Sequence, residues 1–146
     1  MHKESGFTLI ELLVVISLIG IMAGIGTLGM RGVLAHYRLK TGVYTLVSDL
    51  RTVKQLAINK QVRHGIKFNI TNRRYKLFND TVGEFKTKML NQELDYDSVN
   101  FGGDQEVTFK AIGTADNGSL KLINSNNQTY KIIVSGTGRI RVEQME

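Results

Sequence analysis

The chain of 146 residues contains no cysteine, no proline and no tryptophan. The absence of cysteine excludes disulfides, thiolate metal sites and cysteine nucleophiles. The absence of proline removes the residue that most often interrupts a long helix. Hydrophobic residues make up 42% of the chain and charged residues 22%, which excludes a disordered chain and a protein with many membrane spans. The length is sufficient for one domain and one long helix.

Charge is distributed unevenly along the chain. Residues 31–76 carry eleven Lys or Arg and a single acid, whereas residues 77–116 carry three Lys and eight acids. This pattern suits anionic lipid, nucleic acid or head-to-tail contact between copies of the chain. It also suits two segments that neutralise each other within one fold. The sequence leaves these alternatives open.

The longest run without a formal charge covers the 19 residues 12–30. A helix over this run would reach about 28 Å, close to the ~30 Å of a bilayer's hydrocarbon core. Because the run is apolar on all sides, it belongs in lipid or in the centre of a helical bundle. A secretory signal peptide is the alternative, but the run is longer than is typical and follows an acid, Glu11, that is itself preceded by apolar residues.

Glu11 is the first candidate functional residue. A carboxylate among apolar neighbours costs roughly 2.5–3.5 kcal/mol on membrane-insertion scales unless it has a partner. The structural alternative is a glutamate that reaches the membrane interface from the start of the helix.

The residues around Glu11 form a recognisable motif. After the polar leader, Gly6-Phe7-Thr8-Leu9-Ile10-Glu11-Leu12-Leu13 resembles the prepilin peptidase signature of type IV pilins and type II secretion pseudopilins. The resemblance implies that prepilin peptidase removes residues 1–6 by cleavage between Gly6 and Phe7, and that Phe7 is then N-methylated. It also implies that Glu11 pairs with the Phe7 amine of the adjacent subunit, so that two buried charges fix the axial register during assembly.

The same resemblance implies a single-pass protein of the inner (cytoplasmic) membrane that assembles with other pilin or pseudopilin subunits, with its globular part outside the cytoplasm. The flanking charges point the other way. Only Lys3 precedes the apolar run, whereas Arg31, Arg38 and Lys40 follow it, and this bias favours a cytoplasmic C-terminus. The peptidase signature carries more weight here because it requires a cytoplasmic leader.

Beyond residue 31 the pattern becomes amphipathic and predicts that the helix continues. Apolar residues recur at spacings of three and four, and these residues are Leu39, Val43, Leu46, Leu50, Val53 and Ala57. With no proline in between, we expect one helix over residues 7–60. Its first part, residues 7–30, is the membrane or fibre segment, and its second part packs on a globular domain.

Residues 61–146 change to a period of two and predict a β-rich globular domain. Strands are expected around residues 66–70, 75–77, 107–111, 120–122, 130–134 and 139–142. Residues 79–104 are expected to form a long acidic loop with at most one short strand. The predicted fold class is α+β, with a long N-terminal helix packed on an antiparallel β-sheet domain.

This order of elements resembles the GspH/FimT group of minor pseudopilins. Residues 135–142 are called the tail below. Within the tail, Gly138-Arg139-Ile140-Arg141 resembles the G-R-x-R sequence of FimT-type minor pilins, which is associated with DNA binding during uptake.

The chemistry of the tail is consistent with that association. In an extended strand, Arg139 and Arg141 project from one face, and each guanidinium could meet a phosphate. Gly136 and Gly138 would allow a close approach of the nucleic acid, and Lys121 and Lys131 could widen the patch on neighbouring strands. Stacking aromatics are not evident near the tail, so double-stranded DNA is the expected ligand. An ordinary solvent-exposed strand and an acidic protein partner are the alternatives.

Signatures of catalysis are missing from the sequence. The three histidines are scattered, and no serine-hydrolase or nucleotide-binding motif is present. Asp95, Asp97, Asp104 and Glu106 do not have the spacing of a calcium loop, so a solvated acidic loop is expected. We therefore expect no enzyme activity, no cofactor and no metal. The expected function is a minor pilin of a type IV pilus that binds DNA through its tail. A minor pseudopilin of a type II secretion system and a membrane-anchored binding domain that never polymerises are the alternatives.

Overall fold

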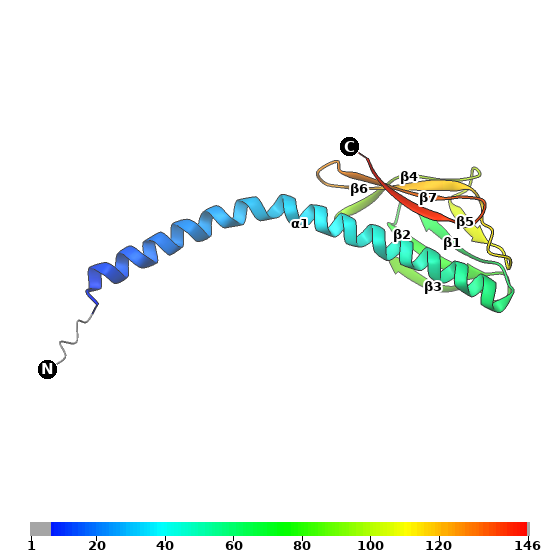
Figure 1. The fold of residues 1–146 in the computed structure, drawn as a ribbon, viewed down its shortest axis with the longest axis horizontal. Coiled ribbons are helices and arrows are strands. Elements are labelled where there is room, and N and C mark those ends of the chain that lie inside the picture. Colours follow the sequence, from blue (N-terminus) through cyan, green and yellow to red (C-terminus); the bar gives the residue numbers. More distant parts are fainter. Residues whose placement is uncertain (1–6, 146) are drawn as a thin grey trace. The chain divides into compact units, whose positions relative to one another are not determined.

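The computed structural model describes residues 7–145, apart from the side chains of residues 25–31. One long helix, α1 (Leu9–Lys60), is followed by a series of β-strands (Figure 1). The helix expected over residues 7–60 agrees with these bounds to within two residues. The chain divides into two compact units, Met1–Leu34 and Ala35–Glu146, so that α1 contributes to both.

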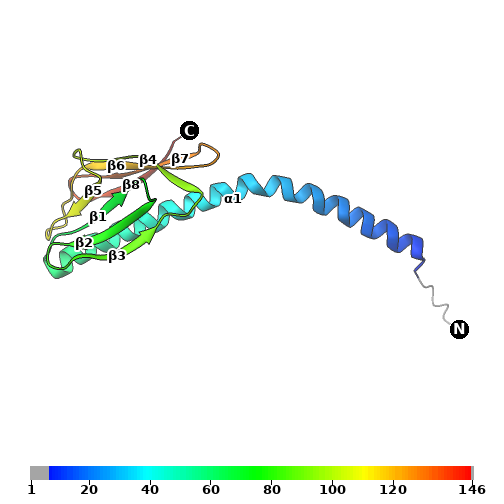
Figure 2. The same ribbon diagram turned by 180° about the vertical axis from the view of Figure 1, so that it is seen from behind.

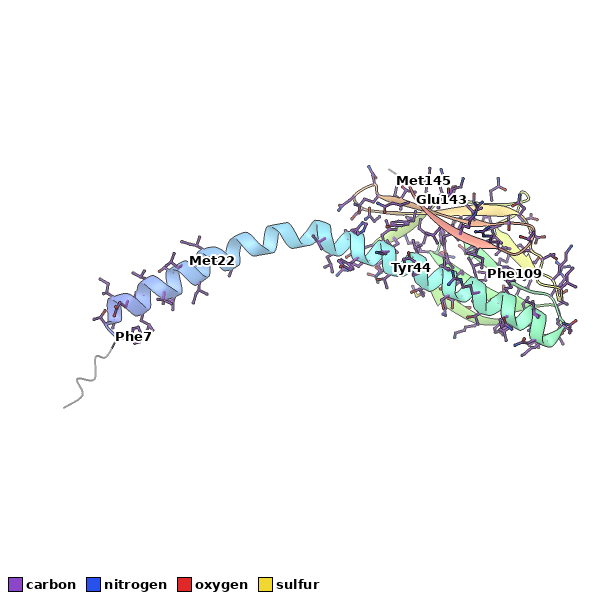
Figure 3. The ribbon with its side chains drawn as sticks, in the orientation of Figure 1. Phe7, Met22, Tyr44, Phe109, Glu143 and Met145 are labelled. Carbon is purple, nitrogen blue, oxygen red and sulfur yellow. The ribbon has the colours of Figure 1, made fainter. Side chains whose placement is uncertain are left out.

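The first unit presents an apolar helix surface. Every described side chain from residue 7 to residue 24 is exposed, and Phe7 and Met22 project from the chain with exposed fractions of 90% and 72% (Figure 3). A helix that is apolar on all sides is unsuited to water and needs a lipid or protein environment. Over the residues that the structure describes, no helix is both long enough and apolar enough to cross a membrane.

The second unit contains two antiparallel four-stranded sheets. The first has the order β3-β2-β1-β5 and consists of β1 (His64–Asn69), β2 (Arg74–Asn79), β3 (Gly83–Met89) and β5 (Glu106–Phe109). The second has the order β4-β6-β7-β8 and consists of β4 (Leu94–Phe101), β6 (Gly118–Asn124), β7 (Thr129–Val134) and β8 (Ile140–Met145). The α+β fold class is confirmed.

The second half of α1 lies against these sheets (Figure 2). It packs on them through the predicted apolar stripe. All six residues of the stripe, Leu39, Val43, Leu46, Leu50, Val53 and Ala57, are completely buried. They join one core with apolar residues from both sheets, among them Ile66 and Phe109 from the first and Leu120 and Ile132 from the second. The helix is therefore part of the hydrophobic core of this unit.

The expected long loop over residues 79–104 is wrong, because this segment forms β3 and β4. Strand β3 is an edge strand, and almost all of its side chains are exposed. An edge strand of this kind carries charges such as Lys86 rather than an apolar alternation, so its sequence resembles that of a loop. The irregular pairing between β2 and β3 after Leu77 disturbs the alternation further.

A β-bulge breaks the period of strand β4, and this is why the sequence predicts at most one short strand in this segment. Leu94 and Tyr96 are buried before the bulge, and Phe101 is buried after it, so the buried positions are not all separated by two residues. The extra residue of a bulge moves the following side chains to the other face of the sheet. Ala111, which was expected in a strand, lies in the turn after β5.

Ion pairs connect the basic segment to the acidic segment. Of the seven ion pairs in the described part of the chain, five join a cation of residues 31–76 to an acid of residues 77–116, and these are Arg38–Glu93, Arg63–Asp80, Lys67–Glu106, Arg73–Asp95 and Lys76–Glu84. They are solvent-exposed, so each contributes at most about 1 kcal/mol to stability. The uneven charge of the sequence is thus partly neutralised within the fold.

Asp49, the single acid of the basic segment, lies in a polar network between α1 and the first sheet. Its carboxylate is almost fully buried and accepts hydrogen bonds from the Tyr75 hydroxyl at 2.6 Å and the Lys88 ammonium at 2.6 and 2.8 Å. Burial, together with the carboxylate of Asp49, raises the pKa of Tyr75 well above its usual range. The tyrosine therefore remains a neutral donor to Asp49 at physiological pH.

Two buried tyrosines provide a test of this network. Replacement of Tyr75 by Phe removes a hydrogen bond to a buried carboxylate, and we expect it to lower the free energy of unfolding by about 1.5–3 kcal/mol. The Tyr96 hydroxyl is buried without a hydrogen-bond partner in the described structure, so Tyr96→Phe should leave that free energy unchanged or raise it by up to about 1 kcal/mol. Denaturant titration of both variants gives the comparison, and equal losses would contradict the assignment.

Candidate functional site

The start of α1 is closed by a reciprocal set of hydrogen bonds between Thr8 and Glu11. The Thr8 backbone N–H and its hydroxyl both donate to Glu11 Oε2 at 3.0 Å, and the Glu11 N–H donates to the Thr8 hydroxyl at 3.3 Å. This arrangement is a capping box, in which an N-cap threonine and a glutamate three residues later satisfy the free N–H groups of the first turn.

Glu11 therefore has a local role that the sequence reasoning missed. The signal was present in the spacing Thr-x-x-Glu before an apolar run, which is typical of a helix N-terminus. The second carboxylate oxygen, Oε1, makes no hydrogen bond within the described residues and is exposed with the rest of the side chain. Phe7 directly precedes the cap, whereas the predicted cleavage residue Gly6 lies outside the described residues.

The tail enters β8 through a tight turn over residues 135–139. The Ser135 N–H donates to the Arg139 carbonyl at 2.9 Å, and the Gly138 N–H donates to the Ser135 carbonyl at 2.7 Å. Along the tail, exposed and half-buried residues alternate, so that Arg139 and Arg141 are exposed and Ile140 between them turns toward the core. The two arginines therefore lie on the same side of the tail, as an extended strand requires.

Gly138 is buried within the protein and is not placed to receive a ligand backbone. Its φ of 73° lies in the left-handed region, and a Cβ atom at this position would overlap the carbonyl oxygen of Gly113. The Lys54 ammonium of α1 donates a hydrogen bond to the Gly138 carbonyl at 3.0 Å. The glycine of the G-R-x-R sequence is thus required by the turn and by its packing on a second turn.

Lys121 and Lys131 lie directly opposite each other on β6 and β7, on the outer face of the second sheet. Each has an acid beside it. Asp97 lies 3.9 Å from the Lys121 ammonium, and Glu143 on β8 is the direct cross-strand neighbour of Lys131. Glu143 is labelled with Met145 near the end of β8 in Figure 3. These acids reduce the positive potential of the sheet face, so the two lysines widen the patch less than the sequence suggested.

The acidic residues considered as calcium ligands are dispersed. Asp95 pairs with Arg73 at 2.9 Å, Asp97 with Lys121, and Glu106 with Lys67 at 3.9 Å. Among the residues that the structure describes, no group of three His, Cys, Asp or Glu side chains is arranged to hold a metal ion.

The neighbouring glycine of the tail provides a matched control for Gly138. Replacement of Gly138 by Ala should lower the free energy of unfolding by about 2–4 kcal/mol, because it combines an unfavourable φ with a steric overlap. At Gly136 an added Cβ would come no closer than 4.0 Å to another atom, so Gly136→Ala should change stability by less than about 0.5 kcal/mol. Thermal unfolding of the two variants measures the difference, and similar melting temperatures would be inconsistent with this account.

Residues 1–27 match the family model of the prokaryotic N-terminal methylation motif. No curated protein sequence matches the chain at a significant level.

The fold is similar to that of two solved proteins. The minor pseudopilin EpsH from the type 2 secretion system of Vibrio cholerae superposes with a TM-score of 0.63 at 15% sequence identity, over 73% of this chain and 97% of EpsH. The type IV minor pilin FimU of Pseudomonas aeruginosa superposes with a TM-score of 0.60 at 13% identity, over 74% of this chain and 90% of FimU. The chain therefore combines a prepilin-type N-terminal methylation motif with a fold that is similar to those of EpsH and FimU.

Proposed function

We propose that the chain is a minor pilin or pseudopilin subunit that prepilin peptidase processes between Gly6 and Phe7 and that then assembles with other pilin-like subunits. The match of residues 1–27 to the N-terminal methylation motif is the observation that carries this proposal. The same motif supports membrane anchoring. We place the globular unit outside the cytoplasm, on a single-pass segment of the inner membrane, because the peptidase acts on a cytoplasmic leader.

The exposed helix of the first unit supports assembly through α1. Apolar side chains such as Leu9 and Ile10 have exposed fractions of 78% and 70%, and each loses contact with water when a neighbouring helix or lipid covers it. Transfer of apolar surface out of water is favourable by roughly 25 cal/mol per Å², so this helix is stable only where lipid or neighbouring helices surround it.

In the proposed assembly Glu11 pairs with the N-terminal amine of Phe7 from an adjacent subunit. The capping box leaves Oε1 unoccupied within the described residues, so one oxygen can serve the helix cap and the other the neighbouring cation. Two opposite charges that neutralise each other in an apolar fibre define one axial register, because any other register leaves both unpaired.

This function is structural, and we propose no catalytic step and no cofactor for the chain. Two systems are consistent with it, a type IV pilus that captures DNA and a type II secretion pseudopilus. The two exposed arginines of the tail favour DNA capture, because neither guanidinium has an ion-pair partner in the described part of the chain. The similarity to EpsH is the observation in favour of the secretion system.

Two substitutions of Glu11 separate helix capping from charge pairing. Gln at this position retains the capping-box hydrogen bonds but loses the charge, whereas Val loses both. We expect both variants to be processed to Phe7 and both to enter filaments at least about tenfold less than the wild type, since the Phe7 amine is left unpaired at a cost of more than about 1.4 kcal/mol. Intact mass measures processing, and immunoblots of sheared filaments measure incorporation. Normal incorporation of the Gln variant would refute the charge pair.

The DNA hypothesis is tested by Arg139→Ala combined with Arg141→Ala in the full chain, solubilised in a neutral detergent. Loss of two phosphate contacts should lower the affinity for double-stranded DNA at least about tenfold at low salt and reduce the salt-dependence slope by about 1.8. Lys76→Ala is the control, because that ammonium is held by Glu84 at 2.6 Å. Fluorescence anisotropy gives both quantities. An affinity equal to that of the wild type would identify the tail as an ordinary solvent-exposed strand.

A further inference from the structure

We propose that the DNA-binding surface extends from the tail onto α1 and onto the turn after β5, and that Lys54, Arg51 and Lys110 contact phosphates together with Arg139. This set is called the cationic band below. The proposal rests on the proposed DNA capture and changes its extent, since the sequence had directed the surface toward Lys121 and Lys131.

Lys54 joins the helix to the tail. Its ammonium donates one hydrogen bond to the Gly138 carbonyl at 3.0 Å, directly before Arg139 in the chain. A lysine ammonium has three donors, so two remain for another acceptor. The side chain is only half-buried, and it forms no ion pair within the described residues. The positive charge of Lys54 is therefore available beside the tail.

The turn after β5, in which Lys110 lies, packs against the turn that precedes Arg139. Within this turn the Gly113 N–H donates to the Lys110 carbonyl, and the Gly113 carbonyl packs directly against Gly138. The Ala115 N–H donates to the Gly136 carbonyl at 3.0 Å, which joins the two turns. Lys110 is exposed, and its ammonium has no ion-pair partner in the described part of the chain.

Arg51 extends the band along the helix. It lies three residues before Lys54, one turn away on the same side of α1. Its side chain is exposed and is absent from the seven ion pairs of the described residues. Asp116, an acid close in sequence to the turn after β5, is engaged elsewhere, since its carboxylate accepts hydrogen bonds from the N–H and hydroxyl of Thr108.

The outer face of the second sheet carries acids beside its lysines, and this feature distinguishes it from the cationic band. The difference decides in which direction the DNA-binding surface extends from the tail. There, Lys121 pairs with Asp97, and Lys131 has Glu143 as its neighbour. Acids placed among the cations repel phosphates, whereas the four members of the cationic band form no ion pair with an acid within the described residues. DNA that follows Arg139 is therefore drawn toward α1 rather than across β6 and β7.

The chemistry of the band favours a phosphodiester backbone over an acidic protein. Lysine and arginine side chains are accompanied here by the hydroxyls of Ser135 and Thr137, which bond to each other at 2.9 Å in the exposed turn. Hydroxyls and cations are the groups that contact phosphates, whereas protein interfaces are built around an apolar centre. Contacts to phosphates predict binding without sequence preference and with a strong dependence on salt.

The test uses the full chain in neutral detergent with double-stranded DNA as the probe. Lys54→Met and Lys110→Met keep most of the aliphatic stem and remove the charge, and Lys121→Met is the matched control on the sheet. We expect each of the first two to weaken binding several-fold and to lower the salt-dependence slope by about 0.9, the value for one phosphate contact. The control should leave both quantities at wild-type values.

The outcomes separate this inference from the DNA hypothesis itself. If the Arg139 and Arg141 variant loses binding but Lys54→Met and Lys110→Met do not, the surface is confined to the tail and the cationic band is wrong. A weaker affinity of Lys54→Met with an unchanged slope would also overturn it, because Lys54 would then act only by holding Gly138. Lys110→Met decides the question if Lys54→Met fails to fold, since the Lys110 side chain is exposed. If no variant changes binding, both the band and the DNA hypothesis fail.

Discussion

The contact between the apolar stripe of α1 and the two sheets is the interaction on which the second unit depends. The stripe is completely buried, and its spacing fixes the rotation of the helix about its own axis. That rotation determines where the polar residues beside the stripe are placed. It directs Asp49 toward Tyr75 and Lys88, and it directs Lys54 toward the Gly138 carbonyl. The packing of one helix face thus positions both the buried polar network and the candidate nucleic-acid surface.

The same helix has a different relation to its surroundings in the first unit. There the apolar residues occupy all sides, so no rotation can bury them within one chain. The helix start is satisfied locally by Thr8 and Glu11, which means that a single chain can form this end of α1 before it has a neighbour. What a single chain cannot provide is cover for the apolar surface of this helix, which needs lipid or other helices around it. The two units thus differ in what they need: the second packs its own core, whereas the first needs cover from outside the chain.

The sequence was sufficient for features that depend on local periodicity. The helix and its buried stripe follow from spacings of three and four, and the strands that contain Leu120, Leu122, Tyr130 and Ile132 follow from a spacing of two. It was insufficient where the period is broken, as at the bulge of β4, or where polar residues distant in sequence meet. The Lys54 ammonium and the Gly138 carbonyl are 84 residues apart, and no local pattern relates them. For the candidate site, the exposure of the two arginines was predicted correctly. The acids that lie beside Lys121 and Lys131 were not predicted, because their positions depend on the register between strands.

The G-R-x-R sequence combines a glycine that the fold requires with two arginines that the fold does not require. The glycine is necessary because the turn needs a positive φ and because Gly113 leaves no room for a side chain. The arginines are not needed by the turn, since their side chains are exposed and form no ion pair within the described residues. Exposed cations that the fold does not use are free to vary unless a ligand requires them. The structural reason for the glycine therefore does not extend to Arg139 and Arg141, which the described part of the chain leaves exposed to solvent.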